Sequence, residues 1–280
     1  MKKSIRLCLI TAAVMIFSSV AVPAGYSYDS YSWYFCQRVE HQRPSSPSEA
    51  SFFSKYDAHY LGPDEKVVYL TFDVGYENGN VEKAANILRK QNVTAAFFTL
   101  PHFLKKNQEL VKRLKDDGNL ICNHTYSHKD MSKYTSFEEF EAELVKNEKL
   151  YYDLYGCEMS KFYRPPEGKF SEANLAWAQK MDYTTIFWSV AYADWDEKCQ
   201  PDPRKAFEKL KKRTHNGAVI LLHPTSSTNA AILEEYILYL KDNGYRFGSV
   251  SELCQANSGA GAIIPSNGKI MCKNSEAKKK

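Results

Sequence analysis

The 280-residue sequence lacks a dominant charge of either sign. Its 37 basic and 33 acidic residues leave a formal net charge of +4 at neutral pH. A surplus this small, spread along the whole chain, gives no reason to expect a nucleic-acid-binding protein. It fits equally a modest attraction to anionic polymers, so the function has to be sought in individual residues.

The sequence also lacks any pair of cysteines at the CxxC spacing, which argues against a structural zinc knuckle. A chain of this size can bury a full core without disulfides. Cys122 lies inside an apolar stretch and is expected to be a buried free thiol. Beyond the N-terminal region six cysteines are scattered, and their pairing does not follow from their positions: Cys36, Cys122, Cys157, Cys199, Cys254 and Cys272.

Long apolar runs are absent too, with one exception, Leu7 to Val22. This run follows a basic start and precedes Pro23-Ala24-Gly25, the three-part pattern of a secretory signal with cleavage after Ala24. An uncleaved membrane anchor is the alternative, because the run lies near the lower length limit for spanning a bilayer. Cys8 comes too early to resemble a lipoprotein attachment site. We therefore expect export, with residues 1–24 as signal peptide or N-terminal anchor.

The remaining chain divides into three parts by composition. Residues 25–64 are rich in Ser, Tyr and Pro and are expected to form an N-terminal extension or linker. Residues 65–255 have the length and apolar content of one folded domain, which we expect to carry any activity. Residues 256–280, with lysines at the end, are expected to be a flexible, solvated tail.

Short β-rich runs alternate with helical patterns inside the predicted domain, which favours an α/β fold with a parallel sheet. The expected strands are Val67–Phe72, Thr94–Leu100, Asn119–Asn123, Phe162–Tyr163, Thr184–Val190, Ala218–Leu222 and Tyr245–Val250. The expected helices are Asn80–Lys90, Asn107–Asp116, Ser136–Leu154, Ser171–Lys180, Pro203–Thr214 and Thr228–Asn243. The number of units predicts a distorted (β/α) barrel, complete or incomplete, whose chemistry collects at the carboxyl ends of its strands.

Two motifs at those strand ends contain residues that could take part in chemistry. Asp73 follows a strand and could be a general base, although an Asp that simply forms the turn at Gly75 is the alternative. His124 and His128 are four residues apart, so one helical turn would direct both imidazoles at a divalent metal. The same spacing also arises by chance, and two ligands leave a metal site incomplete.

Two further motifs supply an arginine and a second acid–base group. Arg164 stands beside the rigid pair Pro165-Pro166, as would suit a guanidinium held against a buried carboxylate; a surface loop is the alternative. His223 follows an apolar strand and could protonate a leaving amine, with Asp194 keeping it charged. A histidine satisfied within the core is the alternative there.

Taken together and in this order, the motifs around Asp73, His124, Arg164, Asp194 and His223 resemble those of the polysaccharide deacetylase family. This is carbohydrate esterase family four, whose NodB homology domain is a distorted β/α barrel, and the resemblance spans roughly residues 65–253. It implies that Asp73 is the base and His223 the acid. Arg164 would orient Asp73, and Asp194 would pair with His223.

The resemblance also implies ligands and substrate contacts. His124 and His128 would bind a divalent metal, with zinc as the first expectation, and Trp195 would help to wall the acetyl pocket. A backbone N–H near Tyr163 would be a donor to the oxyanion. The remaining residues expected along the substrate are Tyr163, Pro165, Pro166 and Asn78.

One position departs from the family pattern. Where the family usually has a second aspartate, the third metal ligand, this chain has Val74, which cannot bind a metal. The strings Tyr76–Asn80 and His223–Ser226 resemble the spore-cortex branch of muramic-acid de-N-acetylases, in which that aspartate is often replaced. Water, substrate or nothing could complete the coordination sphere.

The resemblance implies hydrolytic de-N-acetylation of N-acetylmuramic acid in peptidoglycan, leading to muramic δ-lactam in the spore cortex. It also implies coupling to a muramoyl-alanine amidase, a location on the extracytoplasmic face of the membrane, in the cell wall or in the forespore intermembrane space, and a monomer. The alternatives within the family are an N-acetylglucosamine deacetylase acting on peptidoglycan or chitin, and an O-acetyl xylan esterase. A glycan-binding pseudoenzyme, suggested by Val74, and a purely structural wall protein are the alternatives from other classes.

Overall fold

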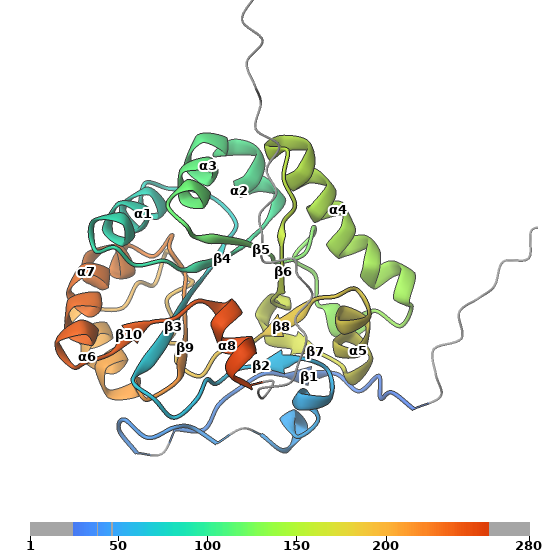
Figure 1. The fold of residues 1–280 in the computed structure, drawn as a ribbon, viewed down its shortest axis with the longest axis horizontal. Coiled ribbons are helices and arrows are strands. Elements are labelled where there is room, and N and C mark those ends of the chain that lie inside the picture. The colour runs from blue at the N-terminus through green and yellow to red at the C-terminus, as the bar shows by residue number, and fades with distance from the viewer. Residues whose placement is uncertain (1–24, 38, 46, 258–280) are drawn as a thin grey trace, which may run out of the picture.

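The computed structural model describes residues 25–37, 39–45 and 47–257, and a curled parallel sheet lies at its centre (Figure 1). Strand β3 (Val67–Val74) is buried along its whole length, as expected for a central parallel strand covered on both faces. The order along the sheet is β10-β3-β4-β5-β6-β8-β2, and β9 pairs with β3. The other strands of this sheet are β2 (Ala58–His59), β4 (Ala96–Thr99), β5 (Leu120–Asn123), β6 (Ser160–Tyr163), β8 (Thr184–Ile186), β9 (Ala218–Leu222) and β10 (Arg246–Phe247).

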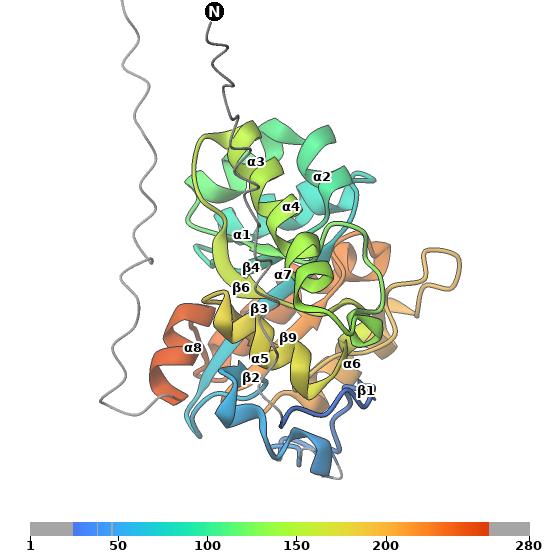
Figure 2. The same ribbon diagram turned by 90° about the vertical axis from the view of Figure 1, so that its right-hand side faces the viewer.

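Helices surround the sheet (Figures 1 and 2). Their bounds are α1 (Asn80–Lys90), α2 (Pro101–Lys106), α3 (Gln108–Asp116), α4 (Phe137–Tyr155), α5 (Glu172–Lys180), α6 (Pro203–Arg213), α7 (Ser227–Asp242) and α8 (Val250–Asn257). Local sequence explains several ends: the Ser136 side chain caps α4, Ser171 and Asn174 form a capping box on α5, and Gly156 ends α4 in the left-handed conformation. The six predicted helices are confirmed to within one residue at each end.

The curled sheet closes only at isolated points, so the predicted distorted α/β barrel is confirmed in an incomplete form. After β8 the chain leaves the sheet and returns as a single bridge between Val190 and Ile220 of β9. The backbone N–H groups of Ser189 and Val190 donate to the carbonyl of Val219 at 2.9 and 3.1 Å. The predicted strand Thr184–Val190 is therefore wrong beyond Ile186, because the chain bends there to reach β9.

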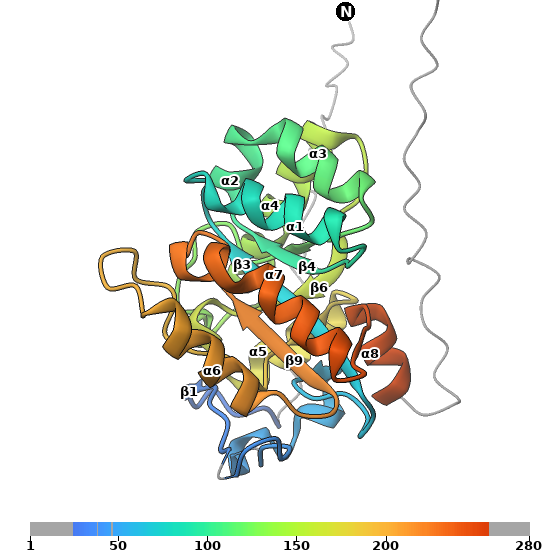
Figure 3. The same ribbon diagram turned by 90° about the vertical axis from the view of Figure 1, so that its left-hand side faces the viewer.

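The ends of the barrel are covered differently. Helix α8 packs Val250 and Leu253 against Val67, Tyr69 and other side chains at the beginning of the central strands. Figure 3 shows α6 and α7 beside β9, and α8 near the end where β9 begins. The predicted strand Tyr245–Val250 is wrong beyond Phe247, because Val250 begins this helix. The carboxyl ends of the strands lie at the opposite end of the barrel.

The segment before the barrel packs against it. Strand β1 (Tyr31–Ser32) pairs antiparallel with β7 (Lys169–Phe170), and β2 pairs parallel with β8. The Trp33 indole N–H donates to the carbonyl of Trp188 at 2.9 Å, and its ring stacks on Phe53. Residues 25–64 thus carry part of an aromatic core, although composition alone suggested only an extension.

The predictions for the two ends of the chain and for the cysteines have different outcomes. The expected signal or anchor, the tail from residue 258 and Cys272 lie outside the described residues. Across residues 25–37, 39–45 and 47–257, no helix is long and apolar enough to cross a membrane. Cys122 is a fully buried free thiol, as predicted.

Candidate active site

The site is built where neighbouring strands end. Asp73 is the second-last residue of β3, His124 follows β5 and Arg164 follows β6. His223 follows β9, which pairs with β3 on its other side. Because parallel strands all end at the same edge of the sheet, these residues, far apart in the sequence, are brought to one place.

Asp73 and Arg164 form a buried ion pair. Nη1 of Arg164 donates to Oδ1 of Asp73 at 2.8 Å, and the guanidinium is 0 % exposed. Burial alone would raise the pKa of Asp73, but the charge of Arg164, its hydrogen bond and the charge of His223 outweigh burial and lower it below its ordinary value. The carboxylate therefore stays ionised, and its Oδ2 is left for another partner.

Arg164 is fixed by more than this pair. Its Nε donates to the carbonyl of Ile186 at 2.9 Å, and its Nη2 donates to the Thr71 hydroxyl at 2.9 Å and to the carbonyl of Phe187 at 3.3 Å. The guanidinium also lies over the Phe98 ring, 4.2 Å from its centroid. The planar fork of arginine is thus used on several sides, which the charge of lysine on a flexible stem could not reproduce.

His124 is held as a neutral imidazole. Its Nδ1 lies 2.8 Å from the carbonyl of Arg164, and since a carbonyl only accepts, Nδ1 carries the hydrogen. Burial lowers the pKa of His124 to about 4, although the Asp73 charge opposes that shift. Its Nε2 therefore presents a lone pair toward Oδ2 of Asp73, 3.6 Å away.

His128 joins His124, but not through the helical turn that the spacing suggested. The segment is an irregular loop in which Thr125 and His128 have φ values of 71° and 56°. Left-handed backbone at residues other than glycine costs on the order of 1–3 kcal/mol each. The two rings nevertheless lie 5.0 Å apart at an interplanar angle of 70°. The prediction of adjacent imidazoles is confirmed, and the helix that was to produce it is wrong.

The donor atoms fit a cation held by two protein ligands. The His124 and His128 rings lie 5.0 Å apart, so both imidazoles could face one cation, and Oδ2 of Asp73, 3.6 Å from His124 Nε2, could accept from a water beside it. Within the described residues no group of three or more His, Cys, Asp or Glu side chains could hold a metal ion. Val74 does not contribute, since it is buried in the apolar cluster of the strands and helices.

His223 and Asp194 form the other half of the site. Nδ1 of His223 lies 2.7 Å from Oδ1 of Asp194, and the backbone N–H of His223 donates to Oδ2 at 2.8 Å. Burial alone would lower the pKa of His223, but its bond to Asp194 and the charges of Asp194 and Asp73 raise it above the ordinary value. The imidazole is 26 % exposed, so its Nε2 can meet a bound molecule.

Asp194 is held by residues that sequence reasoning missed. Asn229 donates from Nδ2 to Oδ2 of Asp194 at 2.6 Å and to the carbonyl of His223 at 3.0 Å. The Tyr192 hydroxyl donates in turn to the Asn229 side-chain oxygen. Asn229 lies in the first turn of α7, and nothing in its local sequence distinguishes it from a capping residue, so only the packing of α7 against β9 shows its role.

The side chains predicted to contact substrate differ in their exposure to solvent. Trp195 is 65 % exposed beside Asp194, where a ligand could reach it, whereas the Tyr163 ring is buried in the core with Trp177. Pro165 and Pro166 are buried as well. The expected roles of Tyr163, Pro165 and Pro166 as substrate contacts stay predictions.

Asn78 is occupied within the protein. Its Nδ2 donates to the carbonyl of Thr225 at 2.9 Å and to Oε1 of Glu197 at 2.5 Å. Its Oδ1 accepts from the backbone N–H of Asn80 at 3.2 Å. Asn78 thus joins the loops after β3, β8 and β9 around the site, and its expected role as a substrate contact stays a prediction.

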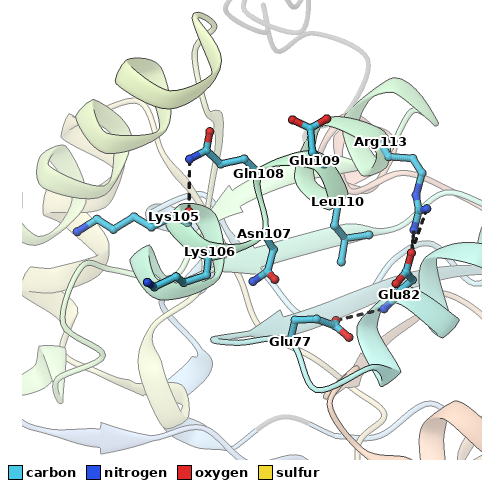
Figure 4. Close-up of a pocket in the computed structure, with 9 residues that line it drawn as sticks. All are labelled: Glu77, Glu82, Lys105, Lys106, Asn107, Gln108, Glu109, Leu110 and Arg113. Atoms are coloured by element: carbon cyan, nitrogen blue, oxygen red, sulfur yellow. Dashed lines mark hydrogen bonds and ion pairs between the residues drawn. The ribbon is translucent and has the colours of Figure 1, made fainter.

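A cavity of about 790 Å³ lies beside helices α1, α2 and α3, away from the candidate catalytic side chains (Figure 4). It is lined by Glu77, Glu82, Lys105, Lys106, Asn107, Gln108, Glu109, Leu110 and Arg113. Arg113 binds Glu82 at 3.2 Å, and Glu77 accepts from the backbone N–H of Glu82 at 3.2 Å. Much of the charge around this open cavity is therefore used within the protein, and none of the catalytic candidates lines it.

The site contains one group suited to act as a base, Asp73, and another suited to act as an acid, His223. Asp73 has a lowered pKa and one oxygen outside its pair with Arg164, and His223, at the end of the neighbouring strand β9, has a raised pKa. Each lowers the free energy of the charged form of the other, as the mutual pKa shifts show. Such a pair suits hydrolysis in which one group accepts a proton from water and the other donates one to a leaving group.

Several known proteins are similar to this chain in sequence and in fold. Residues 61–186 match the family described as polysaccharide deacetylase. The peptidoglycan-N-acetylmuramic acid deacetylase PdaA of Bacillus subtilis is 38% identical over 244 residues, which cover 86% of this chain and 92% of that protein. A peptidoglycan-N-acetylglucosamine deacetylase of Bacillus cereus is 32% identical over 212 residues, covering 74% of this chain and 75% of that protein.

Structural comparison agrees. The structure of Bacillus subtilis PdaA, a family 4 carbohydrate esterase, is similar with a TM-score of 0.77 and 38% identity, covering 81% of this chain and 97% of that one. Identity at this level over most of both chains, together with the similar fold, shows the family. This chain belongs to the polysaccharide deacetylases, the family 4 carbohydrate esterases, which are hydrolases acting on amide bonds.

Proposed function

We propose that this chain removes the acetyl group from N-acetylmuramic acid in peptidoglycan. The observation that carries the proposal is that Asp73, paired with Arg164 and with a lowered pKa, and His223, paired with Asp194 and with a raised pKa, lie at one end of the barrel. Hydrolysis of an acetamide needs both, because water must lose a proton and the departing amine must gain one. The muramic acid substrate is favoured by the similarity to PdaA across almost its whole length.

In the proposed mechanism Oδ2 of Asp73 accepts the proton of the attacking water. Arg164 keeps the carboxylate ionised and holds its other oxygen, so the accepting oxygen has a fixed position. His223 donates a proton from Nε2 to the leaving nitrogen, while Asp194 keeps Nδ1 hydrogen-bonded and the imidazole oriented. A backbone N–H near Tyr163 is the proposed donor to the oxyanion.

Deacetylases of this family are generally metal-dependent. In this chain His124 and His128 would hold the ion, with zinc as the first expectation, and Asp73 Oδ2 lies near enough to His124 to orient a water there. A bound divalent ion would lower the pKa of water and polarise the acetyl carbonyl. Because Val74 replaces the third side-chain ligand, we propose that water or substrate completes the coordination.

The cellular setting follows from the substrate. An enzyme acting on peptidoglycan works outside the cytoplasmic membrane, and the apolar run before residue 25 is the proposed export signal or anchor. If an amidase has already removed the stem peptide, the freed amine can close on the lactyl carboxyl and give muramic δ-lactam. A muramoyl-alanine amidase acting first is therefore the proposed functional partner, and we propose that the enzyme works as a monomer.

Mass spectrometry of peptidoglycan tests the proposal. Intact and amidase-treated glycan would be incubated with the purified protein, with added zinc or with a chelator, beside an Asp73→Asn control. Loss of one acetyl followed by loss of water on muramic residues, only after amidase treatment and only with Asp73, is the expected result. Loss of acetyl from glucosamine would support the activity named for the Bacillus cereus relative. If neither sugar loses an acetyl group, the proposed deacetylase activity is overturned, and a glycan-binding role is supported instead.

A further inference from the structure

Glu143 is a buried acidic side chain that the deacetylation mechanism does not use. It lies on the inner face of α4, next to Leu144, and is 7 % exposed. Glutamate is seldom buried to this degree without partners. Across residues 25–37, 39–45 and 47–257 Glu143 takes part in no ion pair, so neutral donors have to satisfy its oxygens.

Three of those donors belong to the loop between the two histidines, and the Tyr134 hydroxyl is a further one. Oε2 of Glu143 accepts from the backbone N–H of Ser127 at 2.8 Å and from that of Tyr126 at 3.2 Å. Oε1 accepts from the Ser127 hydroxyl at 2.9 Å. Both oxygens of one carboxylate therefore hold Tyr126 and Ser127, two of the three residues between His124 and His128.

The backbone of this loop needs such a hold. Thr125 and His128 are both in the left-handed region, with φ values of 71° and 56°, and for β-branched threonine this conformation is a genuine outlier. Conformations of this kind persist only where surrounding contacts over-determine them. The two residues bound by Glu143 lie between the two left-handed positions. A hydrogen bond from the His128 N–H to the Thr125 hydroxyl at 3.0 Å closes the turn.

The two histidines differ in how they are anchored. His124 is buried and hydrogen-bonded to the Arg164 carbonyl, whereas His128 is exposed and its imidazole makes no hydrogen bond to the described residues. The position of the His128 ring therefore depends on the backbone that leads to it. That backbone is tied to the rest of the domain through Glu143.

We infer that Glu143 is a positioning residue: it holds the loop between His124 and His128, sets the separation of their rings, and so determines how tightly the pair binds a divalent cation. The inference rests on the proposed function only where it treats the histidines as metal ligands. The hold on the loop itself can be tested in the absence of metal.

Hydrogen exchange of the metal-free full chain tests the hold. In Glu143→Ala the amides of Tyr126 and Ser127 should exchange at least roughly tenfold faster, since their acceptor is gone. Glu141→Gln, a matched charge removal on the same helix at a partly exposed residue, should leave both rates as in the native chain. The Thr125 amide, which donates to the Asn123 side chain at 2.9 Å, is the internal reference.

Zinc titration by calorimetry tests the consequence. Removal of a group that orients a ligand typically weakens metal binding about 10- to 100-fold, and this loss is expected for Glu143→Ala with native affinity in Glu141→Gln. In kinetics kcat should fall more than KM rises, because the misplaced group is a catalytic ligand rather than a substrate contact. Native exchange rates and native zinc affinity in a folded Glu143→Ala chain would overturn the inference.

Glu143→Gln keeps the test decisive if the alanine variant does not fold. Its side chain retains one acceptor oxygen, so intermediate exchange rates and intermediate zinc affinity support the inference, and native values in both overturn it. If the native chain binds no zinc, the metal assignment of the proposed function fails. The shift of the His128 ring resonances between native and Glu143→Gln protein then decides the positioning role alone, and unchanged resonances would overturn it.

Discussion

The two aspartates of the site, Asp73 and Asp194, show how the same side chain is given different work by its partners. Asp73 binds a guanidinium with one oxygen and leaves the other facing the site. Asp194 has both oxygens occupied, by His223 and by Asn229. An aspartate with a free oxygen can take up a proton, whereas one that is fully hydrogen-bonded can only tune its neighbour. The difference lies in the partners and not in the carboxyl groups.

The largest effect is expected at Asp73. Asp73→Asn preserves the shape that Arg164 contacts but removes the basic oxygen, so kcat/KM should fall by about 10²- to 10⁴-fold, the usual contribution of a general base. Steady-state kinetics on amidase-treated peptidoglycan measures it. Asp242→Asn, an exposed aspartate at the end of α7, is the matched control and should retain native activity. Substantial activity in Asp73→Asn would remove the distinction drawn between the two aspartates.

Arg164→Lys should damage the same half of the site through stability. Breaking a buried ion pair costs about 3–5 kcal/mol, and lysine cannot reach the Ile186 and Phe187 carbonyls together with Asp73. Urea unfolding followed by fluorescence should show this decrease in the free energy of unfolding. A lysine variant as stable as the native chain would mean that Arg164 serves only as a charge.

Asp194→Asn should change the pH dependence more than the maximum rate. Asp194 raises the pKa of His223, so the acid form persists to higher pH in the native enzyme. Asparagine would remove the negative charge and lower that pKa, which moves the alkaline limb of kcat/KM to lower pH by about one unit. The acid limb, set by the depressed pKa of Asp73, should stay in place. A profile with its alkaline limb unmoved would contradict the pairing of Asp194 with His223 as acid.

The smallest effect is expected at Trp195, outside both aspartate networks. Its side chain is 65 % exposed, so Trp195→Ala should leave the free energy of unfolding within about 0.5 kcal/mol of the native value. If the indole packs on the sugar, KM should rise two- to tenfold, equivalent to about 0.5–1.5 kcal/mol of aromatic contact. Trp195→Phe should retain most of the affinity. Unchanged KM in the alanine variant would exclude Trp195 from the substrate groove.

The sequence predicted most helices and strands and the motif residues, because both depend on residues close together along the chain. The period of apolar residues located α1 and β9 at their observed bounds. Short elements such as α2 and β2 were missed, since six or two residues contain too little periodicity to detect. The strand expected to reach Val190 was too long, because apolar content does not show where a chain bends away from a sheet.

The sequence by itself determined which residues stand at the strand ends and which of them can exchange protons, because strand–helix alternation and side-chain chemistry are properties of the chain. Only the tertiary structure decided which oxygen of Asp73 stays open, how a strained loop brings His128 to His124, and that Glu143 and Asn229 hold the two halves of the site. These features depend on contacts between segments far apart along the chain. Their energies come from burial and hydrogen-bond geometry that no local pattern encodes.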